Sequence, residues 1–256
     1  ACNVLLTAAV AATAAFGSAS AYSSRYVGAT LNHHGARHGG RVHVGRSDPP
    51  RARSTLAMGL GVPDLSTDPR IATSRGMQAF RKGDVAGSLE QFDAAIAADE
   101  RYTLYLWQRG LSLYYAGKFE EGAVQFRRDV AANPNDTEEA IWTFLCEAQT
   151  NGFEAARKQM LKVGKDSRPI MRMVNELFLG DASEEDLATA GHKAGPGSRA
   201  EFYALLYLGL YNEAKGDAVH AKGYIQQAVS SAYGKGNPDP DYMYSLSVVH
   251  ARERGW

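Results

Sequence analysis

Two glycines, Gly76 and Gly110, lie 34 residues apart, and each begins the same pattern of small and aromatic residues. Each is followed by a second glycine seven positions on, a small residue twelve positions on, and a phenylalanine sixteen positions on (Phe92 and Phe126). Small residues let two helices approach closely, and an aromatic side chain fills the space between them. The spacing therefore predicts a repeat in which each unit is a hairpin of two helices.

The 34-residue step continues further along the chain. A third unit has Ala140, Ala156 and Met160 in register, although Phe144 takes the place of the glycine, and Gly209 restores the pattern in a later unit. Helical hairpins with this period are typical of tetratricopeptide (TPR) repeats. The sequence therefore predicts an all-α fold, a TPR superhelix of about five helix pairs with a C-terminal capping helix.

Glycines, prolines and capping residues set the expected limits of these pairs. Asp136 and Ser183 are expected to cap helices, because each precedes an acidic residue at the spacing of a capping box. The last helix is expected to cover the open end of the array, where a terminal repeat has no neighbour. The expected pairs span residues 68–101, 102–136, 137–166, 169 to about 194, and 199–231, and the last helix spans 241–252.

Two residues depart from the repeat pattern, Arg109 and Asp129, at positions that are normally apolar and small. Their opposite charges allow them to pair across the hairpin; alternatively, both side chains reach solvent. A buried pair of this kind is weak evidence for stability in either direction.

The first 58 residues differ from the rest and predict a targeting leader, followed by a linker over 59–68 and a helical domain over 69–256. Residues 4–16 form an apolar run of 13, too short to span a bilayer, and the small residues Ala19-Ser20-Ala21 follow. We expect a signal peptide over 1–21, a disordered transit-like segment over 22–58, and no integral membrane segment in the mature chain. Such a leader resembles the bipartite presequences of algae with secondary plastids, which predicts a plastid location in the stroma or the thylakoid lumen.

Charge separates the same two parts of the chain. The leader holds six arginines, no lysine and one acidic residue, Asp48, which leaves 22 basic and 27 acidic residues and a net charge of −5 in the remainder. A mildly acidic domain offers no electrostatic surface for phosphate backbones. We therefore expect no nucleic-acid partner.

No residue pattern indicates catalysis or cofactor binding. His192, His220 and His250 are isolated, and Ser183 is better explained as a helix cap than as a nucleophile. No glycine-rich phosphate loop precedes a helix. The sequence therefore predicts a protein that is not an enzyme and that holds no cofactor and no metal.

The first helices of the repeats supply the candidate binding residues. In a TPR superhelix, defined positions of each first helix line the concave face, and here they are apolar and aromatic, as in interaction surfaces. The alternative is that the repeats or the chain's own last helix cover these side chains as part of the core. The lysine and asparagine clamp for a C-terminal carboxylate is absent, which disfavours a chaperone-tail receptor. The candidates for binding a protein partner are Trp107, Gln108, Leu111, Tyr114, Tyr115, Trp142, Leu145 and Tyr207.

From Arg101 onward the chain resembles the bacterial NlpI family of TPR lipoproteins. The resemblance is carried by residues 133–136 (Asn-Pro-Asn-Asp), residues 142–145 (Trp-Thr-Phe-Leu), the segment 174–184 and Phe202-Tyr203. It implies an all-helical adaptor, often dimeric, that brings a C-terminal processing protease to its substrates and scaffolds peptidoglycan hydrolases. Because the leader here is plastid-like and not a lipoprotein signal, only the adaptor role is expected to carry over.

Two functions are compatible with these features. The first is a non-catalytic adaptor or scaffold in the plastid that positions a C-terminal processing protease or another protein, with a homodimer left open. The second is an assembly factor or subunit of a photosynthetic membrane complex. Both use the same surface, so the sequence does not separate them.

Overall fold

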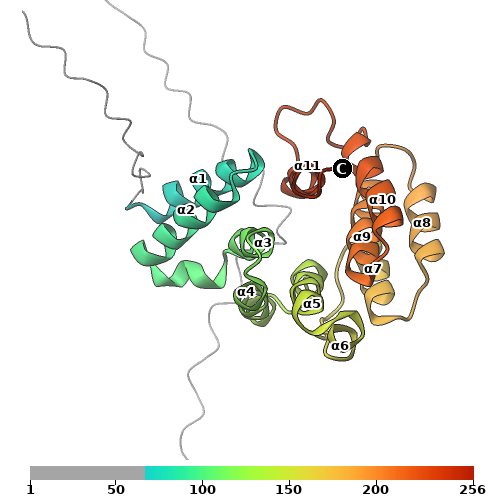
Figure 1. Cartoon of the computed structure of the whole chain (residues 1–256), viewed down its shortest axis with the longest axis horizontal. Coiled ribbons are helices and arrows are strands. Elements are labelled where there is room, and N and C mark those ends of the chain that lie inside the picture. Colours follow the sequence, from blue (N-terminus) through green and yellow to red (C-terminus); the bar gives the residue numbers. More distant parts are fainter. Residues whose placement is uncertain (1–66) are drawn as a thin grey trace, which may run out of the picture. The chain divides into compact units, whose positions relative to one another are not determined.

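The structure is a computed structural model that describes residues 67–256 (Figure 1). The expected signal peptide over 1–21, the transit-like segment over 22–58 and all but the end of the linker lie outside these residues.

Residues 67–256 form eleven α-helices and one short 3-10 helix, with no β-strand among them (Figure 1). Ten of the α-helices follow one another as five consecutive pairs, and the eleventh comes last, which confirms the all-α fold class and the arrangement as a helical repeat array. The helices are α1 (Pro69–Arg81), α2 (Val85–Ala98), η2 (Glu100–Leu104), α3 (Trp107–Tyr115), α4 (Phe119–Ala132), α5 (Thr137–Asn151), α6 (Phe153–Lys158), α7 (Pro169–Leu179), α8 (Glu184–Lys193), α9 (Arg199–Lys215), α10 (Ala218–Ser230) and α11 (Tyr242–Arg254).

The glycines that define the sequence period are the points where paired helices touch. A Cβ atom at Gly76 would lie 2.8 Å from Phe92 Cε1, and one at Gly110 would lie 2.6 Å from Phe126 Cζ. In the last pair, a Cβ atom at Gly209 would lie 2.6 Å from the end of the Ile225 side chain. In these three pairs, the first helix therefore accepts a large side chain from the second at a position where only glycine leaves room.

A second contact recurs between one pair and the next. Ser88 Oγ of α2 donates a hydrogen bond to Ser112 Oγ of α3 over 2.8 Å. One repeat later, Gly122 of α4 faces Cys146 of α5, whose sulfur would lie 2.9 Å from a Cβ atom at that glycine. Because the same relative positions meet in both cases, successive pairs are stacked in the same register.

Substitution at two glycines tests this packing. We expect Gly110→Ala to lower the free energy of unfolding by about 1–3 kcal/mol, because the new methyl group overlaps the buried Phe126 ring. Gly223→Ala is the matched control, because Gly223 lies within α10 and has no atom within 4 Å of an added Cβ. The control should raise stability by about 0.5–1 kcal/mol through helix propensity alone. Urea unfolding measures both, and equal effects of the two substitutions would contradict the packing described here.

The expected helix caps are present. Asp136 accepts a hydrogen bond from the backbone N–H of Glu138 over 3.0 Å at the start of α5. Ser183 and Asp186 form a reciprocal capping box at the start of α8. These local features confirm the predicted starts of both helices.

Arg109 and Asp129 do not pair with each other, and they do not both reach solvent, so neither expected arrangement is present. Arg109 Nε donates to Asp93 Oδ1 of α2 over 2.7 Å, and its Nη1 lies 3.5 Å from Gln125 Oε1. Asp129 is buried and accepts from Gln125 Nε2 over 3.1 Å. Gln125 thus lies between Arg109 and Asp129, and Arg109 pairs instead with Asp93 of the preceding helical pair.

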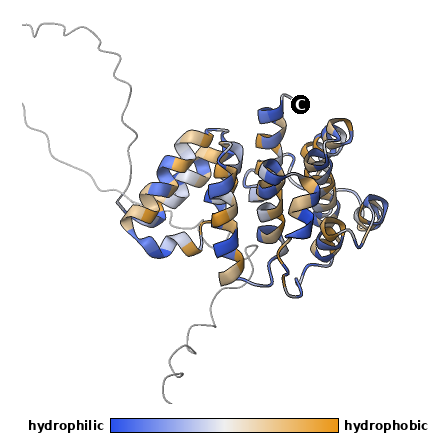
Figure 2. Ribbon diagram, turned by 60° about the horizontal axis from the view of Figure 1, so that its bottom comes forward, coloured by the Kyte–Doolittle hydropathy of each residue, from blue (hydrophilic) through white to orange (hydrophobic). Residues whose placement is uncertain are grey.

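The helices differ in how much of their circumference is buried. Most carry hydrophilic residues on one side and hydrophobic residues on the other (Figure 2). In contrast, residues 139–147 of α5 and 206–212 of α9 are all buried, as are 242–247 of α11. A helix that is buried all round lies inside a helical protein, so α5, α9 and α11 form the interior of the described unit.

The last helix does more than cover the last pair. As expected, it packs on α10, where Tyr244 OH donates to the carbonyl oxygen of Val229 over 2.8 Å. It also packs on α1, where Arg252 Nη1 donates to the carbonyl oxygen of Lys82 over 2.8 Å. The sequence predicted the first contact; the second joins the end of the array to its first pair.

Candidate binding face

Four aromatic candidate residues lie on α3 and α5, and the rings of three of them, Tyr114, Tyr115 and Trp142, are in mutual contact. The Trp142 ring lies 5.3 Å from the ring of Tyr114 and 6.4 Å from that of Tyr115, measured between centroids. Tyr115 lies 5.7 Å from Phe80 of α1, which extends the cluster, and Trp107 lies at the start of the same helix, α3. We call these five side chains, Phe80, Trp107, Tyr114, Tyr115 and Trp142, the aromatic face.

The other four candidates lie elsewhere. Leu111 and Leu145 are completely buried in the core, and Gln108 Nε2 lies 4.0 Å from the sulfur of Met77 in α1. Tyr207 is also completely buried, on α9, where its hydroxyl group donates to Glu138 Oε1 over 2.8 Å. The structure therefore assigns these four side chains to packing and to a polar contact apart from the aromatic face.

The last helix covers the aromatic face. The Tyr242 ring stacks on Phe80 at 5.5 Å and meets the edge of Trp107 at 5.3 Å. Tyr115 OH lies 2.9 Å from His250 Nδ1, and His250 is completely buried. The sequence allowed cover by the repeats or by the last helix, and the structure shows both. The last helix packs on Phe80, Trp107 and Tyr115. Rings of the repeats pack on Tyr114 and Trp142.

Tyr242 and His250 were missed as members of this site. The sequence predicted one role for the last helix, covering the open end of the array, and Tyr242 and His250 were not assigned to a second contact. A helix with apolar residues all round is the signal that a second contact surface exists.

Hydrogen bonds and charges hold His250 between three helices. Burial, together with the nearby positive charge of Arg254, lowers the pKa of His250 to about 3, so the imidazole is neutral. Its Nε2 lies 3.2 Å from Glu213 Oε2 on α9, while Arg254 binds the other oxygen of that carboxylate. The contact with Tyr115 OH is a hydrogen bond at Nδ1, whereas Nε2 and Glu213 Oε2 lie close to each other without forming one.

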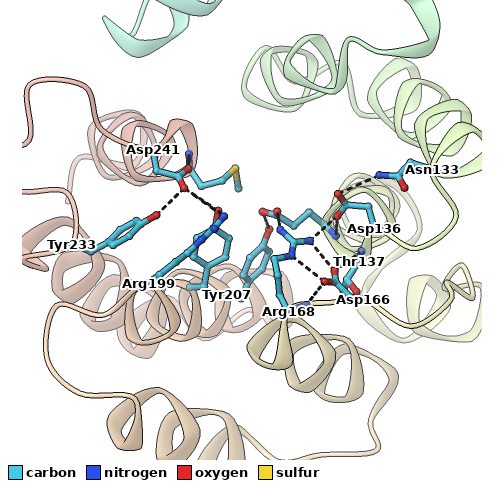
Figure 3. Close-up of polar contacts among 12 residues, drawn as sticks. Asn133, Asp136, Thr137, Asp166, Arg168, Arg199, Tyr207, Tyr233 and Asp241 are labelled. Carbon is cyan, nitrogen blue, oxygen red and sulfur yellow. Dashed lines mark hydrogen bonds and ion pairs between the residues drawn. The ribbon is translucent and has the colours of Figure 1, made fainter. Parts of the chain in front are cut away.

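A polar network lies beside the aromatic face and contains Tyr207. Arg168, which precedes α7, donates to Asp136 Oδ1 over 2.9 Å, to Asp166 Oδ2 over 2.8 Å, and to Glu138 (Figure 3). Glu138 in turn accepts from Tyr207 OH. The network thus ties the start of α5 to the segment before α7 and to α9.

A second polar group surrounds Asp241, the cap of α11. Asp241 accepts from Tyr203 OH over 3.3 Å and from Tyr233 OH over 2.9 Å, and its carboxylate lies 3.8 Å from Arg199 (Figure 3). The carboxylate also accepts from the backbone N–H of Met243 over 2.9 Å. The chemistry of this group is that of a helix cap held in place by phenols and a guanidinium.

Two further carboxyl groups are buried between α4 and α5. Burial raises the pKa of Asp129 from 3.8 to about 7. Burial, and after it the charge of Asp136, raises the pKa of Glu139 from 4.5 to about 9. One oxygen of each carboxyl group has no hydrogen-bond partner, so both groups favour the protonated form.

This pair makes stability depend on pH. Because both pKa values are raised, the folded protein binds more protons than the unfolded chain between about pH 4 and pH 9, and the free energy of unfolding falls as pH rises. The neutral, buried His250 acts in the opposite direction below about pH 6.5, but its contribution is smaller than that of the two carboxyl groups. We therefore expect a net fall of several kcal/mol between about pH 5 and pH 8, measured by urea unfolding. Asp129→Asn should reduce this slope, and Glu120→Gln, at an exposed position on α4, should leave it unchanged. A wild-type stability that rises over this range would contradict the burial of the pair.

Residues 67–256 contain neither a cluster of metal-binding side chains nor a helix that could span a membrane. No group of three or more histidine, cysteine, aspartate or glutamate side chains is arranged to hold a metal ion there. None of the helices in that range has the length and apolar character required to cross a membrane.

Fold and site together define an all-α array of consecutively packed helical pairs, with an aromatic face that the last helix covers. No known protein-family model matches the chain.

Proposed function

We propose that this protein is a non-catalytic TPR adaptor or scaffold that binds a protein partner. The observation that carries the proposal is the repeated glycine contact, Gly76 with Phe92, Gly110 with Phe126 and Gly209 with Ile225, which joins the two helices of successive pairs in the same way. Such arrays present extended surfaces built from many first helices, and their usual use is protein binding.

The partner class comes from the resemblance to the NlpI family. By that resemblance the protein brings a C-terminal processing protease, or another protein, to its substrates in the plastid. The aromatic face supports a protein ligand, because tryptophan and tyrosine dominate the energetics of such interfaces. A homodimer is compatible with this role, and no nucleic acid is involved.

Affinity purification of the tagged full-length chain from plastids tests the proposal. Recovery of a C-terminal processing protease would support the adaptor role, and recovery of photosystem subunits would instead support an assembly factor. Gly110→Ala serves as a control, because weakened packing of the second pair should reduce specific recovery. If neither class of protein is enriched over that control, the proposed function is wrong.

A further inference from the structure

The last helix lies on the aromatic face as a bound helix would. Its Tyr242 packs between Phe80 of α1 and Trp107 of α3, and its His250 meets Tyr115 further along α3. Arg254, at its end, binds Glu213 of α9. One face of a single helix thus makes contacts with three others at points spread over its whole length.

The chemistry of this contact is that of an interface between separate proteins. Tyrosine, tryptophan and arginine are the residues enriched at such interfaces, whereas interiors are mainly aliphatic. In addition, the Tyr242 hydroxyl group is buried without a hydrogen-bond partner. A buried hydroxyl group without a partner costs free energy, so α11 is bound less tightly than it would be with an aliphatic side chain of the same size.

The connection to α11 allows the helix to leave without breaking another pair. Residues 235–239 are all exposed, and Gly236 has a φ of 81°. Pro238 and Pro240 also interrupt regular structure in this segment. Arg81 of α1 makes two contacts with it, an ion pair with Asp239 at 3.5 Å and a hydrogen bond to the carbonyl oxygen of Pro240 over 3.5 Å. Exposed ion pairs contribute little to stability.

We propose that α11 is a displaceable occupant of the aromatic face, and that an amphipathic helix of a protein partner binds there in its place. The pattern in α11 defines that helix: an aromatic residue in the first turn, aliphatic residues four and seven positions later, and a basic residue twelve positions later (Tyr242, Leu246, Val249 and Arg254). This is helix-in-groove recognition with the groove filled by the chain itself. The inference rests on the proposed function, because it names the partner element that the adaptor binds.

The occupied state sets the affinity that a partner would show. If α11 is undocked in about one molecule in a hundred, the apparent affinity for an external helix falls by about a hundredfold. Weakening α11 must therefore strengthen external binding, which is the opposite of what substitution in a passive interface does.

Hydrogen exchange of the full-length chain tests whether α11 opens by itself. We expect its amides to show protection factors at least about tenfold below those of α5 and α9, and Tyr242→Ala to lower the α11 values alone. If this variant does not fold, Tyr242→Leu keeps the side chain apolar and removes only the ring contacts. Amides of α11 that exchange together with those of α5 would overturn the proposal.

A peptide probe tests whether the uncovered face takes a helix. A labelled synthetic peptide of residues 239–256 should bind the Tyr242→Ala chain at least about tenfold more tightly than the wild type, and a scrambled peptide should bind neither. Val219→Ala, at an exposed site on α10, is the matched control and should behave as the wild type does. Equal affinities for the variant and the wild type, or no binding to either, would overturn the proposal even if α11 opens.

The two proposals fail in distinguishable ways. If α11 opens and exchanges with the peptide but no partner co-purifies, the adaptor role is wrong and the exchangeable helix stands. If a protease co-purifies equally with the wild type and Tyr242→Ala, the adaptor role stands and its partner binds elsewhere.

Discussion

Replacing Trp142 with alanine should lower the free energy of unfolding by about 3–5 kcal/mol. The side chain is 2% exposed, and its ring packs against Phe126, Tyr114 and Tyr115. Removal leaves a cavity among three aromatic rings that the surrounding helices cannot close. For a domain of this size, the melting temperature should fall by roughly 6–20 °C, measured by calorimetry or circular dichroism.

Val219→Ala is the control for this experiment, because Val219 is 81% exposed and the substitution should change stability by no more than about 0.5 kcal/mol. Trp142→Phe should lie between the two, since it keeps a ring in the cluster. If Trp142→Ala proved as stable as the control but no longer bound a partner, Trp142 would be a contact residue and its buried position here would be wrong.

Replacing Arg168 with alanine should have an effect of similar size, about 3–5 kcal/mol, because it leaves three carboxylates without their shared cation. The Arg168 side chain is 16% exposed, and its carboxylate partners Asp136 and Asp166 are 5% and 4% exposed. Solvent therefore screens these charges poorly. Arg168→Lys should recover part of the loss, since an ammonium group restores the charge but cannot bind several carboxylates at once.

The loss on Arg168→Ala should shrink in acid. Burial alone would raise the pKa of Asp166, but hydrogen bonds from Arg168 outweigh it and lower the pKa below 3.8. The stabilising effect is therefore fully present above the unfolded pKa and is lost as pH falls through the folded one. Urea unfolding at pH 7 and near pH 3 measures the difference. Arg101→Ala, which breaks an exposed pair with Asp99, should have no measurable effect at either pH, and an equally silent Arg168→Ala would contradict the network.

The features of the fold that the sequence predicted depend only on contacts between residues of the same helical pair. Gly110 and Phe126 are sixteen residues apart on adjoining helices, so their types and spacing in the sequence were enough to predict the contact. The caps at Asp136 and Ser183 are more local still. Five pairs and a last helix could therefore be found from spacing together with turn and capping residues.

The parts that the sequence could not predict depend on several pairs at once. Arg252 and Lys82 are 170 residues apart. Their contact depends on the combined geometry of all five pairs, and the repeat spacing in the sequence does not specify that geometry. The candidate residues show the same limit. Repeat positions brought Trp107, Tyr115 and Trp142 to one face, but whether they are exposed depends on what else lies there.

The sequence also did not predict which side chains form hydrogen bonds and ion pairs with each other. As an acidic residue in the first turn of α5, Glu138 favours the start of that helix whatever its other partners are. Its contacts with Arg168 and Tyr207 come from an irregular segment and a distant helix, for which no sequence pattern exists. Tyr207 was chosen as a candidate for its repeat position, and its hydrogen bond to Glu138 could not be read from that position.

The most direct measurement is the set of nuclear Overhauser effects between the last helix and the first two pairs. In a sample with labelled aromatic residues, ring protons of Phe80 and Tyr242, and of Tyr115 and His250, should give cross-peaks, because their centroids lie 5.5 and 5.8 Å apart. Their absence, with Phe80 and Trp107 rings accessible to a soluble paramagnetic probe, would show that α11 does not cover the aromatic face.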